Sequence, residues 1–142
     1  MIDASGLPFA TMFMDKSVLD ETHPCYDGAL MQPEVRAFIE DADQVLAISA
    51  LMTDFNTGAF TSQLDAAKTI SIGKHRMPAG DKTFFNVELA DLLKILTARL
   101  KRRDWPKIAR KTLGAAKGAG ADKIAAAALY PRLASFCART TF

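Results

Sequence analysis

The chain has 142 residues, of which 49% are hydrophobic and 24% charged, a composition typical of a soluble globular protein with a buried core. Its formal net charge of +2 indicates no polyanionic partner, so binding to nucleic acid is disfavoured. No apolar run approaches the roughly 20 residues that a membrane-spanning helix needs, and the N-terminus lacks the basic start and apolar centre of a signal peptide. We therefore expect a cytoplasmic protein that does not associate with a membrane.

The first predicted strand is the short apolar run LPFATMF at residues 7–13. Residues 16–21 are expected to form a short helix or turn, and the dipeptides His-Pro at 23–24 and Asp-Gly at 27–28 are turn signals. A helix is then predicted to begin at Pro33, because a proline suits the first helical turn. Its apolar face repeats at three- and four-residue steps and comprises Val35, Phe38, Ile39 and Ala42.

The clearest strand is QVLAISAL at residues 44–51, which is apolar almost throughout, as in a parallel strand covered on both faces. A polar loop follows at residues 53–58, and TISI at residues 69–72 predicts a third strand. A turn-rich connection at residues 74–82 leads to a fourth predicted strand at residues 83–87. The alternation of strands and helices predicts an α/β fold built on a parallel sheet.

A regular leucine stripe predicts the longest helix of the first hundred residues. The stripe comprises Leu89, Leu92, Leu93, Leu96 and Leu100. Residues 104–122 lose this periodic pattern, and their Ala, Gly and Lys composition is typical of a linker. Residues 124–138 are predicted to be helical again, with Pro131 interrupting the helix.

Several of these segments form one long collinear pattern. Its most specific parts are GLPFATMFMDKSVLDE at residues 6–21, PEVRAFIEDADQVLAISALMTDFNTGAF at 33–60 and VELADLLKIL at 87–96. The pattern resembles the central domain of the thiamine-diphosphate-dependent 2-oxo acid decarboxylases, the family of the indolepyruvate, phenylpyruvate and pyruvate decarboxylases. The likeness covers residues 6–100 and resumes with ALYPRLASF at residues 128–136.

The resemblance implies a fold and a division into domains. The fold is α/β, a three-layer Rossmann-like parallel sheet that is incomplete at its N-terminal edge, because the family's first strand and helix have no counterpart in this sequence. Residues 1–103 correspond to a partial central domain and residues 104–123 to a linker. Residues 124–142 correspond to the start of the C-terminal cofactor-binding domain.

The resemblance also implies the chemistry of the intact enzymes, lyases that convert a 2-oxo acid to an aldehyde and CO2 with thiamine diphosphate and Mg2+. Their catalytic glutamate and His-His pair lie in an N-terminal domain, and a Gly-Asp-Gly…Asn motif for the metal and diphosphate lies in a C-terminal domain. This chain contains neither a His-His pair nor a Gly-Asp-Gly sequence. We therefore predict no catalytic, cofactor-binding or metal-binding residue, and a fragment that is inactive and binds neither cofactor alone.

The best candidate site is the polar loop after the strand at residues 44–51. Ligands of an open parallel sheet bind beyond the carboxyl ends of its strands, so this loop could contact a phosphate, a ribose or a neighbouring domain. Capping and domain packing are favoured instead, because an aspartate would repel a phosphate and the Gly-rich dinucleotide fingerprint is absent. On that interpretation Asp54 and Asn56 cap the next helix and Gly58 supplies an unusual backbone angle. The candidate residues are Thr53, Asp54, Asn56, Thr57 and Gly58.

Other reactive residues give weaker signals. Cys25 and Cys137 match no metal or redox spacing, so both thiols are expected to be reduced. His23 and His75 are the only histidines, and neither has a ligand partner at helical spacing that would indicate zinc. The basic run at residues 99–111, which includes a tryptophan, is interpreted as a solvated helix end and linker rather than a nucleic-acid site.

Three functions follow from the sequence. The first is a scaffold that spaces the two catalytic domains of a decarboxylase. Its expected partners are those flanking domains or a full-length homologous subunit, since the family forms homo-oligomers. The alternative is a free-standing nucleotide- or small-ligand-binding Rossmann-like module, and the third is an interaction protein that docks on a full-length decarboxylase.

Overall fold

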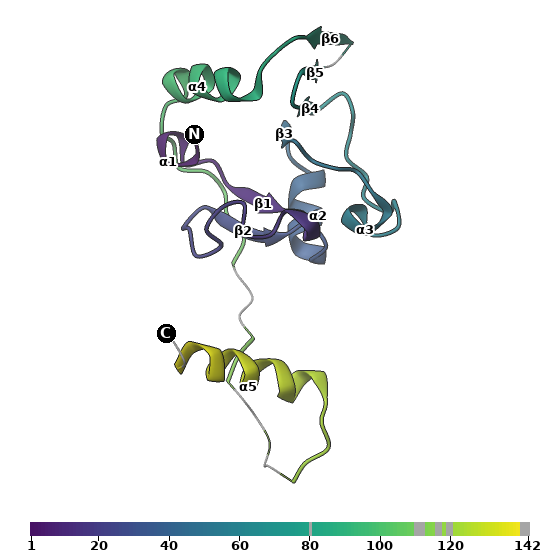
Figure 1. The fold of residues 1–142 in the computed structure, drawn as a ribbon, viewed down its shortest axis with the longest axis vertical. Helices are drawn as coiled ribbons and strands as arrows, with labels where there is room; N and C mark the ends of the chain where they lie inside the picture. The colour runs from purple at the N-terminus through teal and green to yellow at the C-terminus, as the bar shows by residue number, and fades with distance from the viewer. Residues whose placement is uncertain (80, 110–112, 116–117, 119–120, 140–142) are drawn as a thin grey trace. The chain divides into compact units, whose positions relative to one another are not determined.

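A computed structural model describes the whole chain except residues 80, 110–112, 116–117, 119–120 and 140–142 (Figure 1). The chain divides into two compact units, Met1–Ala109 and Arg110–Phe142. The predicted linker at residues 104–123 and the end of the basic run at residues 110–111 fall partly outside the described residues. Within the part of the chain that the structure describes, no helix is long and apolar enough to cross a membrane.

The first unit begins with a single helical turn, α1 (Ile2–Ser5), followed by a two-stranded parallel sheet. The strand predicted at residues 7–13 is confirmed over a shorter span, β1 (Phe9–Thr11), and a 3-10 turn, η1 (Phe13–Asp15), follows it. The partner strand, β2 (Tyr26–Ala29), was not predicted, because its Asp-Gly pair signals a turn. A hydrogen bond of 3.0 Å joins the hydroxyls of Thr11 and Tyr26 across the two strands.

The predicted helix at Pro33 is confirmed as α2 (Pro33–Glu40), and its first turn contains the proline. Val35 on this helix is only 2% exposed and packs beside Gly28 of β2. Only a glycine fits at this close approach, because a Cβ at residue 28 would lie 3.0 Å from a methyl group of Val35. Other apolar side chains buried among the described residues include Met12, Cys25, Tyr26, Leu30, Ala47 and Ile72.

The second sheet of the unit has four strands in the order β3-β4-β5-β6. The predicted strands at residues 44–51 and 69–72 are confirmed as β3 (Val45–Ile48) and β4 (Thr69–Ile72), which pair in parallel. Between them lies one further helical turn, α3 (Asp54–Thr57). These elements confirm the α/β class of the fold.

The second sheet is parallel between β3 and β4 and antiparallel from β4 onward. Residues 74–82, expected to be a connection, contain a strand, β5 (Arg76–Ala79), that pairs antiparallel with β4 and with β6 (Lys82–Phe85). Pro78 lies within β5, and β4 pairs with this strand only at Ala79, so the missing proline N–H removes no ladder bond to β4. The strand β1 pairs with β2 rather than with β3, so the parallel pairs belong to two separate sheets.

The leucine-rich helix is confirmed as α4 (Leu89–Arg99). After α4 the chain returns to α1 at the start of the unit, where the backbone N–H of Arg103 donates to the carbonyl oxygen of Ser5 at 3.0 Å (Figure 1). The first and last segments of the unit are therefore joined directly.

The second unit contains one helix, α5 (Ala126–Arg139), among its described residues. Pro131 was predicted to interrupt this helix, and that prediction is wrong, because the helix continues through it. A proline removes only one backbone hydrogen bond, and the turns on either side retain theirs. The guanidinium of Arg132 also donates to the carbonyl oxygen of Gly118, which ties the helix to the preceding segment.

Candidate functional site

The candidate loop begins with a side-chain cap on α3. Thr53 is the N-cap residue, and its Oγ1 accepts a hydrogen bond from the backbone N–H of Asn56 at 3.2 Å. The hypothesis that Asp54 and Asn56 cap this helix is therefore wrong, because the capping residue is Thr53. The carboxylate of Asp54 instead accepts from the adjacent N–H of Phe55 at 2.7 Å.

Asn56 is fully buried, with 0% of its surface exposed, and its amide joins two loops. Its Nδ2 donates to the carbonyl oxygen of Leu51 at 2.8 Å, and its Oδ1 accepts from the backbone N–H of Met14 at 3.1 Å. Through this side chain the loop after β3 is held against η1, which α3 contacts. Both ends of the amide are thus satisfied by backbone groups of the same unit.

Thr57 and Gly58 shape the turn that closes the loop. The Thr57 hydroxyl donates to the carbonyl oxygen of Thr53 at 2.7 Å and accepts from the N–H of Phe60 at 3.1 Å. Gly58 has a φ of 64°, and Ala59 and Phe60 follow at 56° and 61°. The expected unusual angle at Gly58 is confirmed, but two residues with side chains share it. Each of them carries the steric strain of a left-handed backbone.

Beside this turn lies an open hollow of about 380 Å³. It combines apolar and hydroxyl-bearing side chains and includes one member of the candidate loop, Thr57. Ser62 contributes a buried hydroxyl oxygen that has no hydrogen-bond partner among the described residues. The other lining residues are Met52, Phe60, Leu64, Ala66, Thr69, Ser71 and Pro78. None of these was a sequence candidate, because they come from four separate segments with no common spacing.

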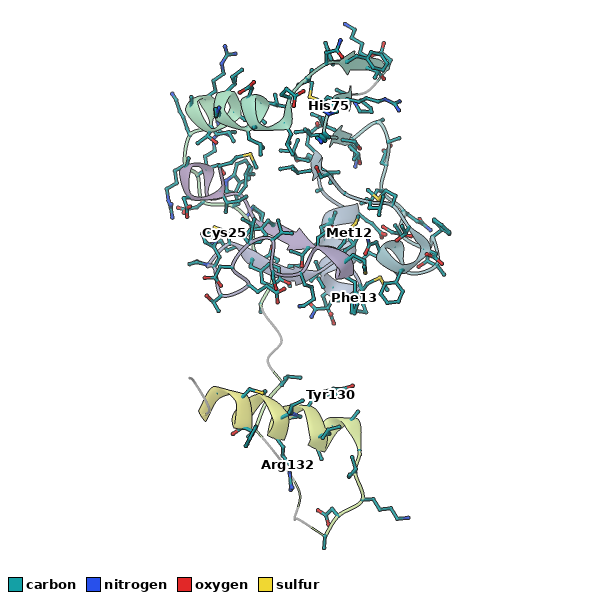
Figure 2. All side chains as sticks on the ribbon, viewed as in Figure 1. Met12, Phe13, Cys25, His75, Tyr130 and Arg132 are labelled. Atoms are coloured by element: carbon teal, nitrogen blue, oxygen red, sulfur yellow. The ribbon has the colours of Figure 1, made fainter. Side chains whose placement is uncertain are left out.

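The outer side of the loop is apolar. Phe55 of α3 and Phe13 of η1 form an edge-to-face pair with ring centroids 4.9 Å apart. Both rings remain largely exposed, at 58% and 50%, and the adjacent Met14 is 67% exposed. Figure 2 shows Phe13 next to Met12 at one end of the β1–β2 sheet, with Cys25 at the other end.

Charged residues of α2 hold the far end of the loop. Arg36 donates to the hydroxyl of Thr61 at 2.9 Å, and the carboxylate of Glu40 accepts from the backbone N–H of Gln63 at 2.7 Å. Arg36 and Glu40 also form an ion pair at 3.8 Å. The polar groups of this region therefore bind the loop to α2.

The candidate loop does not fit a diphosphate with its metal. Among the described residues, no group of three or more His, Cys, Asp or Glu side chains lies close enough to hold a metal ion. The carboxylate of Asp54 at the start of α3 would repel a phosphate, and α3 is a single turn with little helix dipole. The polar groups of the loop instead hold it against the rest of its unit.

The histidines lie in separate pairs with carboxylates. His23 Nε2 lies 3.0 Å from Asp3 Oδ1, and His75 Nδ1 lies 2.7 Å from Glu88 Oε1. The hydrogen bond and the charge of His23 lower the pKa of Asp3 below its ordinary value of 3.8. The two histidines are therefore not brought together into one site.

The cysteines also lie in different settings. Cys25 is buried and Cys137 is exposed, and in the described part of the chain they form no disulfide. The Cys25 thiol donates to the carbonyl oxygen of Gly6 at 3.4 Å. The thiol hydrogen is therefore used in a contact inside the unit.

The basic run is partly used for internal contacts. The side chains of Arg102, Trp105 and Lys107 donate to the backbone oxygens of residues 3, 5 and 24. The cations of the run that the structure describes remain exposed, as in the expected solvated helix end, and two of them also form hydrogen bonds within the unit. No sequence pattern indicates these contacts, because they join residues 83 to 100 positions apart.

Comparison with known proteins identifies the class to which this unit belongs. Residues 1–100 match the family described as the thiamine pyrophosphate enzyme, central domain. The chain belongs to this family, whose central domain is a Rossmann-like α/β fold. The resemblance drawn from the sequence is confirmed, and the family implies thiamine diphosphate as the cofactor of the enzymes that contain this domain.

The relatives are 2-oxo acid decarboxylases. An alpha-keto-acid decarboxylase of Mycobacterium leprae is 36% identical over 107 residues, which cover 72% of this chain and 19% of that protein. The alpha-keto-acid decarboxylase of Mycolicibacterium paratuberculosis is 34% identical over a region of the same length. Pyruvate decarboxylase isozyme 1 of Saccharomyces cerevisiae is 34% identical over 102 residues, which cover 68% of this chain and 18% of that protein. The matched region is therefore about a fifth of each relative.

Proposed function

We propose that this chain is the central scaffold domain of a thiamine-diphosphate- and Mg2+-dependent 2-oxo acid decarboxylase of the indolepyruvate, phenylpyruvate or pyruvate type. The observation that carries the proposal is the family match over residues 1–100, together with relatives named as decarboxylases. The candidate loop supports a scaffold role, because the Asn56 amide is satisfied within the unit at both ends and offers nothing to a ligand.

On this proposal residues 1–103 form the central domain, 104–123 a linker and 124–142 the start of a cofactor-binding domain. The partners are the flanking catalytic domains or a full-length homologous subunit, in a cytoplasmic homo-oligomer. The exposed Phe13–Phe55 pair supports such docking, because adjacent exposed aromatic rings often mark protein interfaces. The chain by itself binds no cofactor and does not catalyse decarboxylation.

Calorimetric titration of the purified chain with thiamine diphosphate and Mg2+, alongside an indolepyruvate decarboxylation assay, tests this proposal. We expect neither saturable heat nor release of CO2. Binding at one site per chain, or turnover, would contradict the scaffold role and require a cofactor site in this chain.

One observation favours a second candidate function, a nucleotide- or small-ligand-binding module. The hollow beside the candidate loop has a volume of about 380 Å³ and includes a buried Ser62 hydroxyl that, in the part of the chain that the structure describes, has no hydrogen-bond partner. Titration with ADP under the same conditions separates the two functions. A saturable signal that is lost in Ser62→Ala would favour the binding module over the scaffold.

A further inference from the structure

The segment at residues 100–107, here called the strap, has no regular secondary structure and lies along α1. Its backbone N–H at Arg103 and the indole N–H of Trp105 both donate to the carbonyl oxygen of Ser5, at 3.0 Å each. Arg102 Nη1 donates to the carbonyl oxygen of Asp3 at 2.9 Å. The strap is thus bound to one helical turn through that turn's last carbonyl groups, which a helix leaves unpaired.

The strap also contacts two neighbours of the buried Cys25 thiol, Gly6 and Pro24. A Cβ at Gly6 would lie 2.8 Å from the carbonyl oxygen of Arg103, so the strap approaches the Gly6 backbone closely. On its other side Gly6 accepts the thiol hydrogen of Cys25 at 3.4 Å. Lys107 Nζ donates to the carbonyl oxygen of Pro24, next to Cys25, at 3.2 Å. The strap therefore contacts Gly6, which accepts from the thiol, and Pro24, which precedes Cys25 in the chain.

Few contacts hold the strap in place. Most of its side chains are exposed, and only Leu100 and Trp105 are half-buried. Three of the four hydrogen bonds described above come from side chains. Two of those side chains are long, exposed cations whose hydrogen bonds add little net stability. Segments with few buried contacts and exposed hydrogen bonds open locally at a lower free energy than the whole domain.

We propose that the strap is a releasable clamp that opens by local unfolding and uncovers α1 and the Cys25 thiol while both sheets stay folded. Trp105 is its principal anchor, because it combines a half-buried ring with a hydrogen bond to Ser5. The chain continues from the strap into residue 110, where the second unit begins.

The thiol itself reports the opening. With Cys137→Ser as the parent, Cys25 is the only thiol, and its rate of alkylation by iodoacetamide under native conditions measures the open population. We expect slow labelling whose rate rises only weakly with urea below the unfolding transition, because a local opening exposes little surface. Trp105→Phe keeps an aromatic ring but loses the donor, and should speed labelling roughly fivefold. Lys101→Ala, in the same strap at an exposed position, is the matched control and should leave the rate unchanged.

Two results would overturn the proposal. In the parent, a labelling rate with the full urea dependence of global unfolding would show that Cys25 is reached only when the unit unfolds. This test holds even if Trp105→Phe fails to fold. In a folded Trp105→Phe variant, labelling at the parent's rate would show that Trp105 does not clamp the segment.

Discussion

The backbone N–H of Met14 donates to the buried side-chain amide of Asn56 at 3.1 Å, across 42 positions of the sequence. The same amide donates to the carbonyl oxygen of Leu51, so one side chain ties η1 to the loop after β3. The Phe13 and Phe55 rings pack edge to face beside this contact. The Asn56 amide thus links η1 to the loop after β3, and the arrangement of these two segments depends on it.

Asn56→Ala should lower the free energy of unfolding by about 1–2 kcal/mol, because it removes the two hydrogen bonds that the buried Asn56 amide makes to the Met14 N–H and the Leu51 carbonyl oxygen. Urea unfolding followed by circular dichroism measures the change. Gln63→Ala replaces an exposed amide in the same region and should have little effect. Equal stability of the two variants would show that the Asn56 bridge contributes nothing.

The cap at Thr53 gives a second prediction. Thr53→Ala removes the oxygen that accepts from the Asn56 N–H and should cost about 1 kcal/mol of unfolding free energy. Thr53→Ser keeps an oxygen in the same place and should restore most of that stability. If both variants lost the same amount, the threonine methyl rather than the hydroxyl would be responsible.

The three left-handed residues after α3 predict opposite effects at neighbouring positions. Gly58→Ala places a Cβ 3.0 Å from the terminal methyl of Met31 at a φ of 64°, and should destabilise the unit by about 1–2 kcal/mol. Ala59→Gly relieves the strain at a φ of 56° and should stabilise it by about 0.5 kcal/mol, after the entropic cost of glycine. The two unfolding midpoints, compared with that of the parent chain, provide the measurement. A stabilising Gly58→Ala substitution would contradict the described turn.

The Asp3–His23 pair predicts a dependence on acid pH. The pKa of Asp3 lies below its ordinary value of 3.8, first because His23 donates a hydrogen bond and then through the charges of His23, the N-terminal amino group and Arg102. A carboxyl whose folded pKa is lowered stabilises the fold above pH 3.8 and loses that contribution as the pH falls through the folded pKa.

Unfolding midpoints of the parent and Asp3→Asn from pH 5 downward should therefore differ most above pH 3.8 and converge below it. A parent that gained stability over Asp3→Asn as the pH fell would contradict the pairing. His75→Gln, which removes a partner of Glu88 instead, is a control that should leave the Asp3 profile in place.

The elements that sequence predicts well are those defined by local patterns. Pro33 and the apolar face behind it define α2, the leucine stripe defines α4, and the TISI run defines β4. Two strands were not predicted, because their sequences carry turn residues. β2 contains Gly28 and β5 contains Pro78, and both become strands through pairing with distant segments. Local propensity is a weak guide where such pairing decides the structure.

In the candidate loop the unusual backbone angle of Gly58 was predicted correctly, but the cap was assigned to the wrong residues. Thr53 rather than Asp54 caps α3, because its hydroxyl oxygen accepts from the N–H of Asn56, three positions further along the chain. Asn56 acts across 42 positions, and no local spacing could indicate its bond to Met14. The hollow, including Ser62, is assembled from separate segments for the same reason. Contacts of this kind can be identified only from the three-dimensional structure.

The most direct test of the proposed function replaces the matched segment of the Mycobacterium leprae alpha-keto-acid decarboxylase with residues 1–100 of this chain, and measures decarboxylation of a 2-oxo acid. A second chimera with a glycine-serine linker in the same place is the control. The account predicts that the first chimera decarboxylates its substrate and that the second does not. A first chimera that folds and binds thiamine diphosphate, yet shows no more activity than the linker control, would contradict the scaffold role.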